Sequence, residues 1–270
     1  MVNPPHGKGE RESMTDLLSL ARELIPVVRA AGEIELEYFR SGTEVMDKSD
    51  GSPVTIADQK AEALIAGRLQ ALCPEIPMIG EESVAAGSIP DITGGEFWLV
   101  DPLDGTREFI TGSGDFTVNI ALLKSFVPVM GIIYAPVADE LYFGAEGQAF
   151  MSLQGGSLQK IRVRQAPAVG LTVVASKRHG DPERLNDFLK NKKVAQLVNR
   201  SSSLKFCAIA AGLADFYPRL GPTSEWDTAA GDAILQAAGG RVSMLDGRPL
   251  AYGKTERKFL NPEFVASAAG

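Results

Sequence analysis

The residues best suited to chemistry gather where a short apolar run ends, in the segment WLVDPLDGT at residues 98–106. Asp101 and Asp104 lie three positions apart, and a glycine and a threonine follow directly. The proline after Asp101 favours an extended backbone there, and Gly105 permits a tight turn whose backbone can approach a ligand closely. This spacing lets both carboxylates and the intervening Leu103 carbonyl reach one site.

Two further acids stand at comparable positions in the chain. Glu81 follows the strand-like run PMIG, and Asp227 precedes a segment with helical character. Carboxylates that meet at one edge of a sheet repel one another, and their pKa values rise. Mg²⁺ relieves this repulsion because it takes oxygen ligands and leaves positions for water and phosphate oxygens. Two such ions about 3.5–4 Å apart can hold the attacking and leaving oxygens of a phosphoryl transfer.

Each acid also has a structural explanation when it is taken alone. An Asp-Gly-Thr triplet is a frequent turn. Glu81 suits a solvated loop, and Asp227 suits the acidic start of a helix. Asp58 suits the N3 position of a helix capped by Thr55. The combination of these acids in one chain, rather than any one of them, favours a metal site.

The pattern of apolar residues indicates the elements that would position these acids. Helical spacing predicts a helix over residues 13–40, with Pro26 setting a kink or a later start, and a second over residues 61–72. Strand-like runs, which predict an antiparallel sheet flanked by these two helices, cover residues 97–100, 116–123, 129–135 and 140–143. Short strands then alternate with helices, which is typical of an α/β arrangement.

We therefore expect a mixed α/β (α+β) protein with two sub-domains. A flexible lead-in would occupy residues 1–13, because this stretch is rich in proline, glycine and charge. The N-terminal sub-domain, with the metal site, would span residues 14–155. The C-terminal sub-domain, with substrate-binding residues, would span residues 156–270.

Composition narrows the function classes. No apolar run in the 270 residues approaches the roughly 18 that a membrane-spanning helix needs. The net charge of −7 argues against binding to a nucleic-acid polymer. Cys73 and Cys207 lie far apart in apolar surroundings and indicate buried thiols in a reducing cytoplasm. The sequence leaves open a homodimer and a peripheral association with the inner membrane.

At GEES, DPLDGT and WDTAAG, which occur in this order, the sequence resembles the inositol monophosphatase superfamily of Mg²⁺-dependent, Li⁺-sensitive phosphatases. Further stretches most resemble CysQ-type 3′(2′),5′-bisphosphate nucleotidases, among them GSPVTIAD, SSLKFC, YPRLGPTSEWDTAAGDA and FLNPEF. The resemblance implies a layered α-β-α-β-α sandwich with the active site between its two sub-domains.

The resemblance also implies roles for particular residues. Two or three Mg²⁺ ions per site would be bound by Glu81, Asp101, Asp104, Asp227 and the Leu103 carbonyl. Asp58 and Thr106 would orient and deprotonate the attacking water. The backbone amides of Gly105 and Thr106 would hold the phosphate being cleaved. The metal ligands that would also border the substrate are Glu81, Leu103, Asp104 and Asp227.

A second group of residues would bind the rest of the substrate. The resemblance implies that Ser202, Lys205 and Arg219 grip the nucleotide's other phosphate, and that His179 lies near the ribose or base. The residues themselves permit two interpretations. They could form a positive patch that binds the second phosphate, or they could be solvated surface charge, which basic side chains usually are. The settings of Lys205, at the start of an apolar helix, and of Arg219, after a strand-like run, favour pocket roles.

The implied reaction is direct in-line hydrolysis, without a phosphoenzyme, of the 3′-phosphate of adenosine 3′,5′-bisphosphate to give AMP. Adenosine 3′-phosphate 5′-phosphosulfate would be a further substrate. The alternative is an inositol monophosphatase acting on inositol 1-phosphate or a related sugar phosphate, because GEESVAAG is similar to that branch.

Other classes fit the sequence less well. Haloacid-dehalogenase-type phosphatases need D-x-D-G-T, whereas this chain has D-x-x-D-G-T. No G-x4-G-K-[ST] motif occurs, so a P-loop is absent. The chain contains two histidines, which disfavours histidine-based phosphatases and histidine-rich zinc sites. A binding protein without activity would be expected to lose a metal ligand or the Asp58–Thr106 pair, and all of these residues are present.

Overall fold

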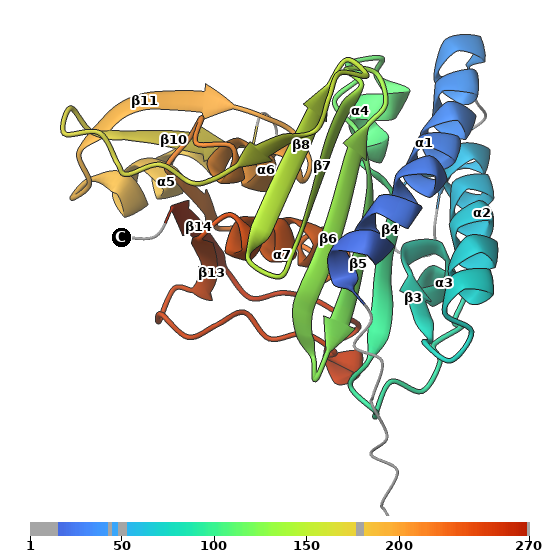
Figure 1. Ribbon diagram of the computed structural model, residues 1–270. Coiled ribbons are helices and arrows are strands. Elements are labelled where there is room, and N and C mark those ends of the chain that lie inside the picture. Colours follow the sequence, from blue (N-terminus) through green and yellow to red (C-terminus); the bar gives the residue numbers. More distant parts are fainter. Residues whose placement is uncertain (1–15, 43–44, 48–52, 177–180, 269–270) are drawn as a thin grey trace, which may run out of the picture.

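The computed structural model describes residues 16–42, 45–47, 53–176 and 181–268. Within these residues the strands form a seven-stranded sheet, a five-stranded sheet and a two-stranded one. Helices cover the outer faces of the two larger sheets, and further helices lie between them (Figure 1). The predicted lead-in at residues 1–13 and the predicted contact His179 lie outside the described residues.

Two helices cover the outer face of the larger sheet. Helix α1 spans Leu17–Ser41, and its N-cap Asp16 accepts hydrogen bonds from two backbone amides of the first turn. Pro26 lies inside this helix without ending it. Helix α2 spans Ile56–Leu72 and begins with the predicted capping box, in which Thr55 and Asp58 bond reciprocally. The apolar faces of both helices pack on the sheet through a shared core.

The larger sheet has the strand order β3-β4-β5-β6-β7-β8-β9. Strands β3 and β4 are parallel, and the remaining neighbours are antiparallel, as the strand-like runs predicted. The strands span Met78–Gly80, Phe97–Asp104, Thr117–Lys124, Val127–Ala135, Glu140–Ala145, Gln148–Leu153 and Gln159–Ile161. Two short helices, α3 (Glu81–Ala85) and α4 (Thr106–Ile110), follow β3 and β4 directly. The two-stranded sheet pairs β1 (Val45–Asp47) with β2 (Pro53–Thr55).

The smaller sheet has the strand order β11-β10-β12-β14-β13. These strands span Leu171–Ala175 (β10), Val194–Asn199 (β11), Phe216–Arg219 (β12), Gly240–Met244 (β13) and Phe264–Ala268 (β14). The helices of this half are α5 (Pro182–Leu189), α6 (Leu204–Ala210) and α7 (Ala229–Ala237), with a 3₁₀ turn, η1, at Thr255–Arg257.

The layers follow from which faces these elements bury. Helices α6 and α7 pack between the two sheets within one large core. Helix α5 packs on the other face of the smaller sheet, around Val173 and Phe216. The order of layers is therefore helices, larger sheet, helices, smaller sheet, helix, which confirms the α-β-α-β-α sandwich (Figure 1).

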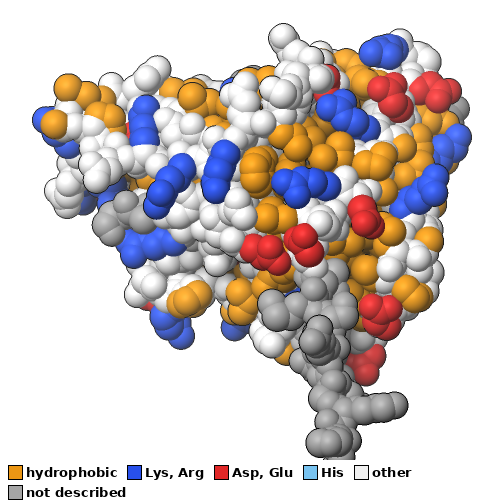
Figure 2. Space-filling view, viewed as in Figure 1, with side chains coloured by type: hydrophobic (Ala, Val, Ile, Leu, Met, Phe, Trp, Pro, Cys, Tyr) orange, Lys and Arg blue, Asp and Glu red, His pale blue; other side chains and the backbone are white. Residues whose placement is uncertain are grey.

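The change from one sheet to the other falls between Ile161 and Leu171, because β9 still pairs with β8. This strand lies beyond residue 155, and the division into two sub-domains stays a prediction. Both cysteines are buried and free, as predicted. Among the described residues, no helix combines the length and the apolar character that crossing a bilayer requires. On the face seen in Figure 2, acidic side chains lie mainly over the larger sheet, whereas basic ones lie over both sheets.

Candidate active site

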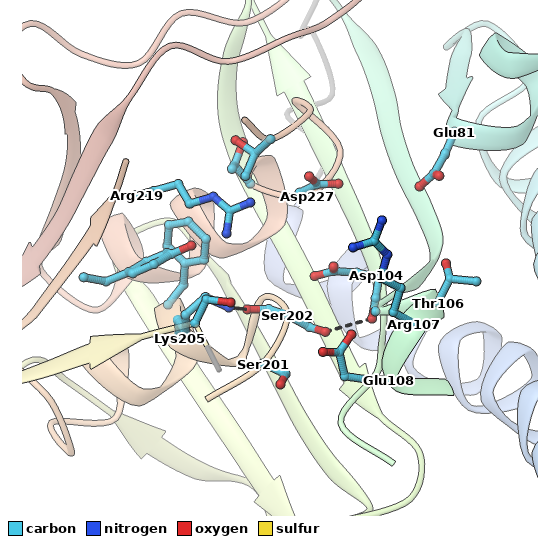
Figure 3. Close-up of a pocket in the computed structure, with 16 residues that line it drawn as sticks. Glu81, Asp104, Thr106, Arg107, Glu108, Ser201, Ser202, Lys205, Arg219 and Asp227 are labelled. Atoms are coloured by element: carbon cyan, nitrogen blue, oxygen red, sulfur yellow. Dashed lines mark hydrogen bonds between the residues drawn. The ribbon is translucent and has the colours of Figure 1, made fainter. Parts of the chain in front are cut away.

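A pocket lies where the two halves of the sandwich meet (Figure 3). The larger sheet and its short helices supply residues 104–108 and Glu81 to its wall. The other half supplies Ser176, Ser201, Ser202, Lys205, Phe206, Tyr217, Arg219, Thr223, Asp227 and Thr228. Most of the residues singled out in the sequence therefore border one cavity, although they lie far apart along the chain.

Three of the predicted metal ligands converge. Oxygen atoms of Glu81, Asp101 and Asp227 all lie within 4.8 Å of one another. Glu81 begins α3 directly after β3, and Asp101 lies on the neighbouring strand β4. Asp227 comes from the loop before α7 in the other half. We call these three residues the acid cluster.

Burial and repulsion from neighbouring acids raise the pKa values of two members of the acid cluster, Asp101 and Asp227. Burial is the largest cause at Asp101, followed by the charges of Glu81, Asp104 and Asp227. At Asp227, burial and then the charge of Asp104 raise the pKa to about 8. Three carboxylates in this setting cannot all ionise without a compensating cation. The donor set, which is made of oxygens only, fits a hard divalent ion.

The segment that carries Asp101 and Asp104 departs from the expected end of a strand. The apolar run was predicted to stop at residue 100, but β4 continues to Asp104. Its pairing with β5 becomes irregular between Asp101 and Asp104, where the Leu103 amide donates to Asp101 Oδ1 at 3.0 Å. Gly105 then turns the chain with a φ of 102°, and a Cβ at this position would lie 2.6 Å from Ser202 Oγ. Glycine is therefore required here for both its conformation and its size.

Asp104 lies beside the acid cluster and is held by residues that the sequence did not single out. Ser203 Oγ lies 2.8 Å from Asp104 Oδ2, and Asn119 Nδ2 lies 3.4 Å from the same oxygen. Asn119 also donates to Ser203 Oγ at 2.7 Å. The only sequence signal for Ser203 was its place in the serine run SSSL, from which Ser202 was chosen. Nothing in its own strand distinguished Asn119, because its role depends on pairing with β4.

Asp58 combines the two roles that the sequence allowed. It is 2% exposed, and its Oδ2 accepts hydrogen bonds from the Thr55 amide at 2.8 Å and the Thr55 hydroxyl at 2.6 Å. Its other oxygen, Oδ1, lies 3.5 Å from Thr106 Oγ1. Thr106 Oγ1 also lies 3.3 Å from the Leu103 carbonyl oxygen. One carboxylate oxygen therefore caps α2 while the other faces Thr106 at the pocket.

Two cations border the opposite side of the pocket. Lys205 is 4% exposed, donates to the Ser202 carbonyl at 2.6 Å and lies 5.3 Å from the centre of the Tyr217 ring. Burial lowers the pKa of Lys205 to about 8, so its ammonium group remains largely charged near neutral pH. Arg219 is fixed by hydrogen bonds to the carbonyls of Gly221 (3.2 Å) and Pro222 (2.6 Å).

The hydroxyl of Ser202 serves the backbone of the opposite half. Ser202 Oγ lies 2.9 Å from the Asp104 carbonyl oxygen and 3.0 Å from the Asp115 carbonyl oxygen. It therefore ties the loop before α6 to both ends of the segment around α4. Its predicted contact with a phosphate stays a prediction.

The loop that carries Asp227 is clamped from outside the pocket. Asp227 Oδ2 accepts a hydrogen bond from the Ser224 amide at 2.9 Å, and the N-cap of α7 is Thr228 rather than Asp227. Asn261 donates from its side chain to the Ser224 carbonyl at 2.8 Å and to Thr228 Oγ1 at 3.0 Å. Asn261 belongs to the FLNPEF segment, so this clamp gives that segment a structural role next to the acid cluster.

Comparisons with known proteins agree with this geometry. The model of the inositol monophosphatase family matches residues 16–268. The 3′(2′),5′-bisphosphate nucleotidase CysQ of Escherichia coli strain K12 is 43% identical over 249 residues, which cover 91% of this chain and 98% of that protein. The CysQ nucleotidase of Haemophilus influenzae is 30% identical over 91% of each chain.

Solved structures that resemble this chain also include members of the inositol monophosphatase family. The crystal structure of CysQ from Bacteroides thetaiotaomicron, a bacterial member of the inositol monophosphatase family, superposes with a TM-score of 0.76 at 38% identity. The match covers 93% of this chain and 97% of that one. An inositol monophosphatase from Zymomonas mobilis superposes with a TM-score of 0.74 at 27% identity and covers 94% of both chains.

Proposed function

Because the chain belongs to the inositol monophosphatase family, we propose that it is a 3′(2′),5′-bisphosphate nucleotidase that hydrolyses adenosine 3′,5′-bisphosphate to AMP and phosphate. The nucleotidases named CysQ share 30–43% of their residues with it over almost their full length. The resemblance in the sequence supports the same substrate.

The observation that carries the proposal is the distribution of charge across the pocket. Figure 3 shows Lys205 and Arg219 across the pocket from Glu81, with Asp104 and Asp227 between them. An acid cluster that takes divalent ions suits the phosphate being cleaved, and two cations on the far wall suit a second phosphate. A substrate with two separated phosphates uses both ends of such a pocket.

We assign the metal site to Glu81, Asp101, Asp104, Asp227 and the Leu103 carbonyl, with two or three Mg²⁺ ions. When bound, these ions would supply charge neutralisation for the transferring phosphoryl group and would lower the pKa of the attacking water. Burial, and after it the charges of neighbouring carboxylates, raises the pKa values of Asp101 and Asp227. These shifts support the assignment, because a bound cation compensates the buried negative charge.

The chain's own groups would perform the remaining tasks. Asp58, whose Oδ1 faces Thr106 Oγ1 at 3.5 Å, would accept the proton of the attacking water, and Thr106 would orient that water. The Gly105 and Thr106 amides would hold the phosphate in line for attack. Lys205 and Arg219 would bind the other phosphate and fix the substrate's position.

Phosphate release from the purified protein tests the proposal. Adenosine 3′,5′-bisphosphate and inositol 1-phosphate would be compared in Mg²⁺, with and without Li⁺. We expect kcat/KM for the nucleotide to exceed that for inositol 1-phosphate at least about 10-fold, because one charge-assisted hydrogen bond already contributes that much. We also expect Li⁺ to inhibit the reaction.

A preference for inositol 1-phosphate would contradict the proposed substrate and move the protein to the other branch of the family. Absence of Mg²⁺-dependent phosphate release from either compound would contradict the metal site as well.

A further inference from the structure

One acid of the pocket belongs neither to the acid cluster nor to the proposed metal site. Glu108 is on α4 and is 7% exposed, and it lines the pocket together with Ser201 and Ser202. Figure 3 shows its carboxylate pointing from α4 toward the Ser202 side of the pocket. Neither the metal site nor the cations described above account for this side chain.

The carboxylate of Glu108 is available to a ligand. Within the part of the chain that the structure describes, its carbonyl oxygen accepts a hydrogen bond from the Ser113 amide at 2.9 Å, but its carboxylate has no hydrogen bond or ion pair. The carboxylate oxygens of Glu35 are sealed in the core without a partner, and those of Glu108 are not among such atoms. Buried carboxylates normally accept hydrogen bonds, so one that faces a cavity can accept a bond from a donor bound there.

The charge of Glu108 restricts which part of a substrate can lie against it. A phosphate beside a carboxylate is repelled, so neither phosphate is expected there. The phosphates instead have the acid cluster with its cations at one end, and Lys205 with Arg219 at the other. The portion between two phosphates of a nucleotide is the nucleoside, whose donors are uncharged hydroxyl and amine groups.

The charge of Glu108 acts on Lys205, which borders the end of the pocket proposed for the second phosphate. Burial lowers the pKa of Lys205 to about 8, and the charge of Glu108 is among those that oppose this lowering. Glu108 therefore also helps to keep Lys205 charged. A carboxylate at this place can contact the nucleoside while Lys205 contacts the phosphate attached to it.

We propose that Glu108 is a specificity residue that accepts a hydrogen bond from an uncharged donor of the nucleoside, either a ribose hydroxyl or the exocyclic amine of the base. This inference rests on the proposed function, because it assumes a bisphosphate nucleotide in the pocket. Loss of a hydrogen bond to a charged group is expected to lower kcat/KM about 10- to 100-fold.

The test compares Glu108→Ala and Glu108→Gln with the unmodified protein on three substrates. These are adenosine 3′,5′-bisphosphate, its 2′-deoxy analogue and the purine riboside 3′,5′-bisphosphate that lacks the exocyclic amine. We expect Glu108→Ala to lose about 10- to 100-fold in kcat/KM on the first substrate and to lose little on the analogue without the relevant donor. Glu108→Gln, which keeps an acceptor oxygen, should lose less than Glu108→Ala.

Two controls make the comparison specific. Glu23→Ala removes an exposed glutamate on α1 and should leave all three kcat/KM values unchanged. Thermal unfolding and the Mg²⁺ requirement of both Glu108 variants should match those of the unmodified protein. If either variant melts early, the ratio between substrates still reports the contact, because unfolding lowers all three values equally.

An equal loss on all three substrates, or no loss on any, would overturn the role of Glu108 while leaving the proposed function intact. A different outcome would contradict both proposals at once. If the unmodified protein prefers inositol 1-phosphate to the nucleotide, the proposed function fails, and the role of Glu108 fails with it.

Discussion

At the scale of single residues, Asp104 is an acid whose charge can be removed with little change of shape. Its Oδ2 is held by Ser203 at 2.8 Å, and an asparagine can occupy the same space. We expect Asp104→Asn to lower kcat by more than about 100-fold, because even residues behind metal ligands often contribute 10- to 100-fold. Steady-state kinetics measures the loss, and Asp91→Asn, which changes an exposed aspartate, is the control.

The melting temperature of Asp104→Asn should stay close to that of the unmodified protein in the absence of metal. Turnover close to that of the unmodified protein would contradict the assignment of Asp104 to the metal site.

Lys205 gives a second prediction at this scale, because the proposed function assigns it to the second phosphate and not to the phosphate that is cleaved. Lys205→Met keeps most of the buried volume but removes the charge near Arg219. We expect kcat/KM for adenosine 3′,5′-bisphosphate to fall about 10- to 100-fold, the contribution of a charge-assisted hydrogen bond. The value for adenosine 3′-monophosphate should change much less. Phosphate release from both compounds measures the difference, with the exposed Lys160→Met as the control.

Equal losses on the two compounds would show that Lys205 supports the fold of the pocket and does not bind the second phosphate.

At the residue scale, the acids could be predicted from the sequence, but the groups that hold them could not. The segment DPLDGT marks Asp101 and Asp104 because few structural needs place two acids after a buried run. Ser203 and Asn119 resemble any other serine and asparagine until pairing of β4 with β5 brings them to Asp104. Glu108 was missed for a different reason, because an acid in a short helix is usually solvated.

At the scale of elements, the contact between β6 and α7 determines how closely the two halves approach. A Cβ on Gly131 of β6 would lie 2.2 Å from the Ala230 carbonyl oxygen of α7. Because this obstacle is backbone, we expect Gly131→Ala to lower the free energy of unfolding by at least about 1–3 kcal/mol. The shift would also move the loop that carries Asp227, so activity should fall. Denaturant unfolding and phosphate release measure the two effects.

Gly67→Ala in α2 is the matched control, because no atom lies within 4 Å of the added Cβ. Alanine is favoured over glycine inside a helix, so this variant should gain about 0.5–1 kcal/mol. Comparable destabilisation by both substitutions would contradict the close contact between β6 and α7.

The elements themselves were largely predictable because periodicity and capping are local signals. The capping box at Thr55 and Asp58 was read from four residues and is present. The end of β4 was predicted too early, since the apolar pattern stops at residue 100 while the backbone pairing continues. Side-chain pattern reports burial, whereas hydrogen bonding between strands decides where a strand ends.

At the scale of the whole molecule, the order of the layers could not be obtained from periodicity. Residues 229–237 are apolar on most sides, which shows that this helix is buried but not between which sheets it lies. The resemblance to a family supplied the sandwich, and with it the expectation that Asp101 and Asp227 meet. That meeting joins the two halves, so the charge of the acid cluster should affect the stability of the whole chain.

The final prediction therefore concerns pH and metal removal. Burial and the charge of Asp104 raise the pKa of Asp227 from 3.8 to about 8, so the folded state holds a proton that the unfolded state releases. The resulting stability is complete below about pH 4 and is lost as the pH rises through about 8. Mg²⁺ at the proposed site would replace that proton, so it should stabilise the protein more at high pH than at low pH.

Melting temperatures with a chelator and with excess Mg²⁺, measured at about pH 5.5 and about pH 8.5, test this linkage. We expect the chelated protein to melt lower at the higher pH and the increase caused by Mg²⁺ to be larger there. Asp227→Asn should weaken both effects, because it removes the carboxylate that exchanges a proton for a metal. An increase of equal size at both pH values would mean that Mg²⁺ binds without displacing protons from the acid cluster, and would contradict the metal site proposed for this pocket.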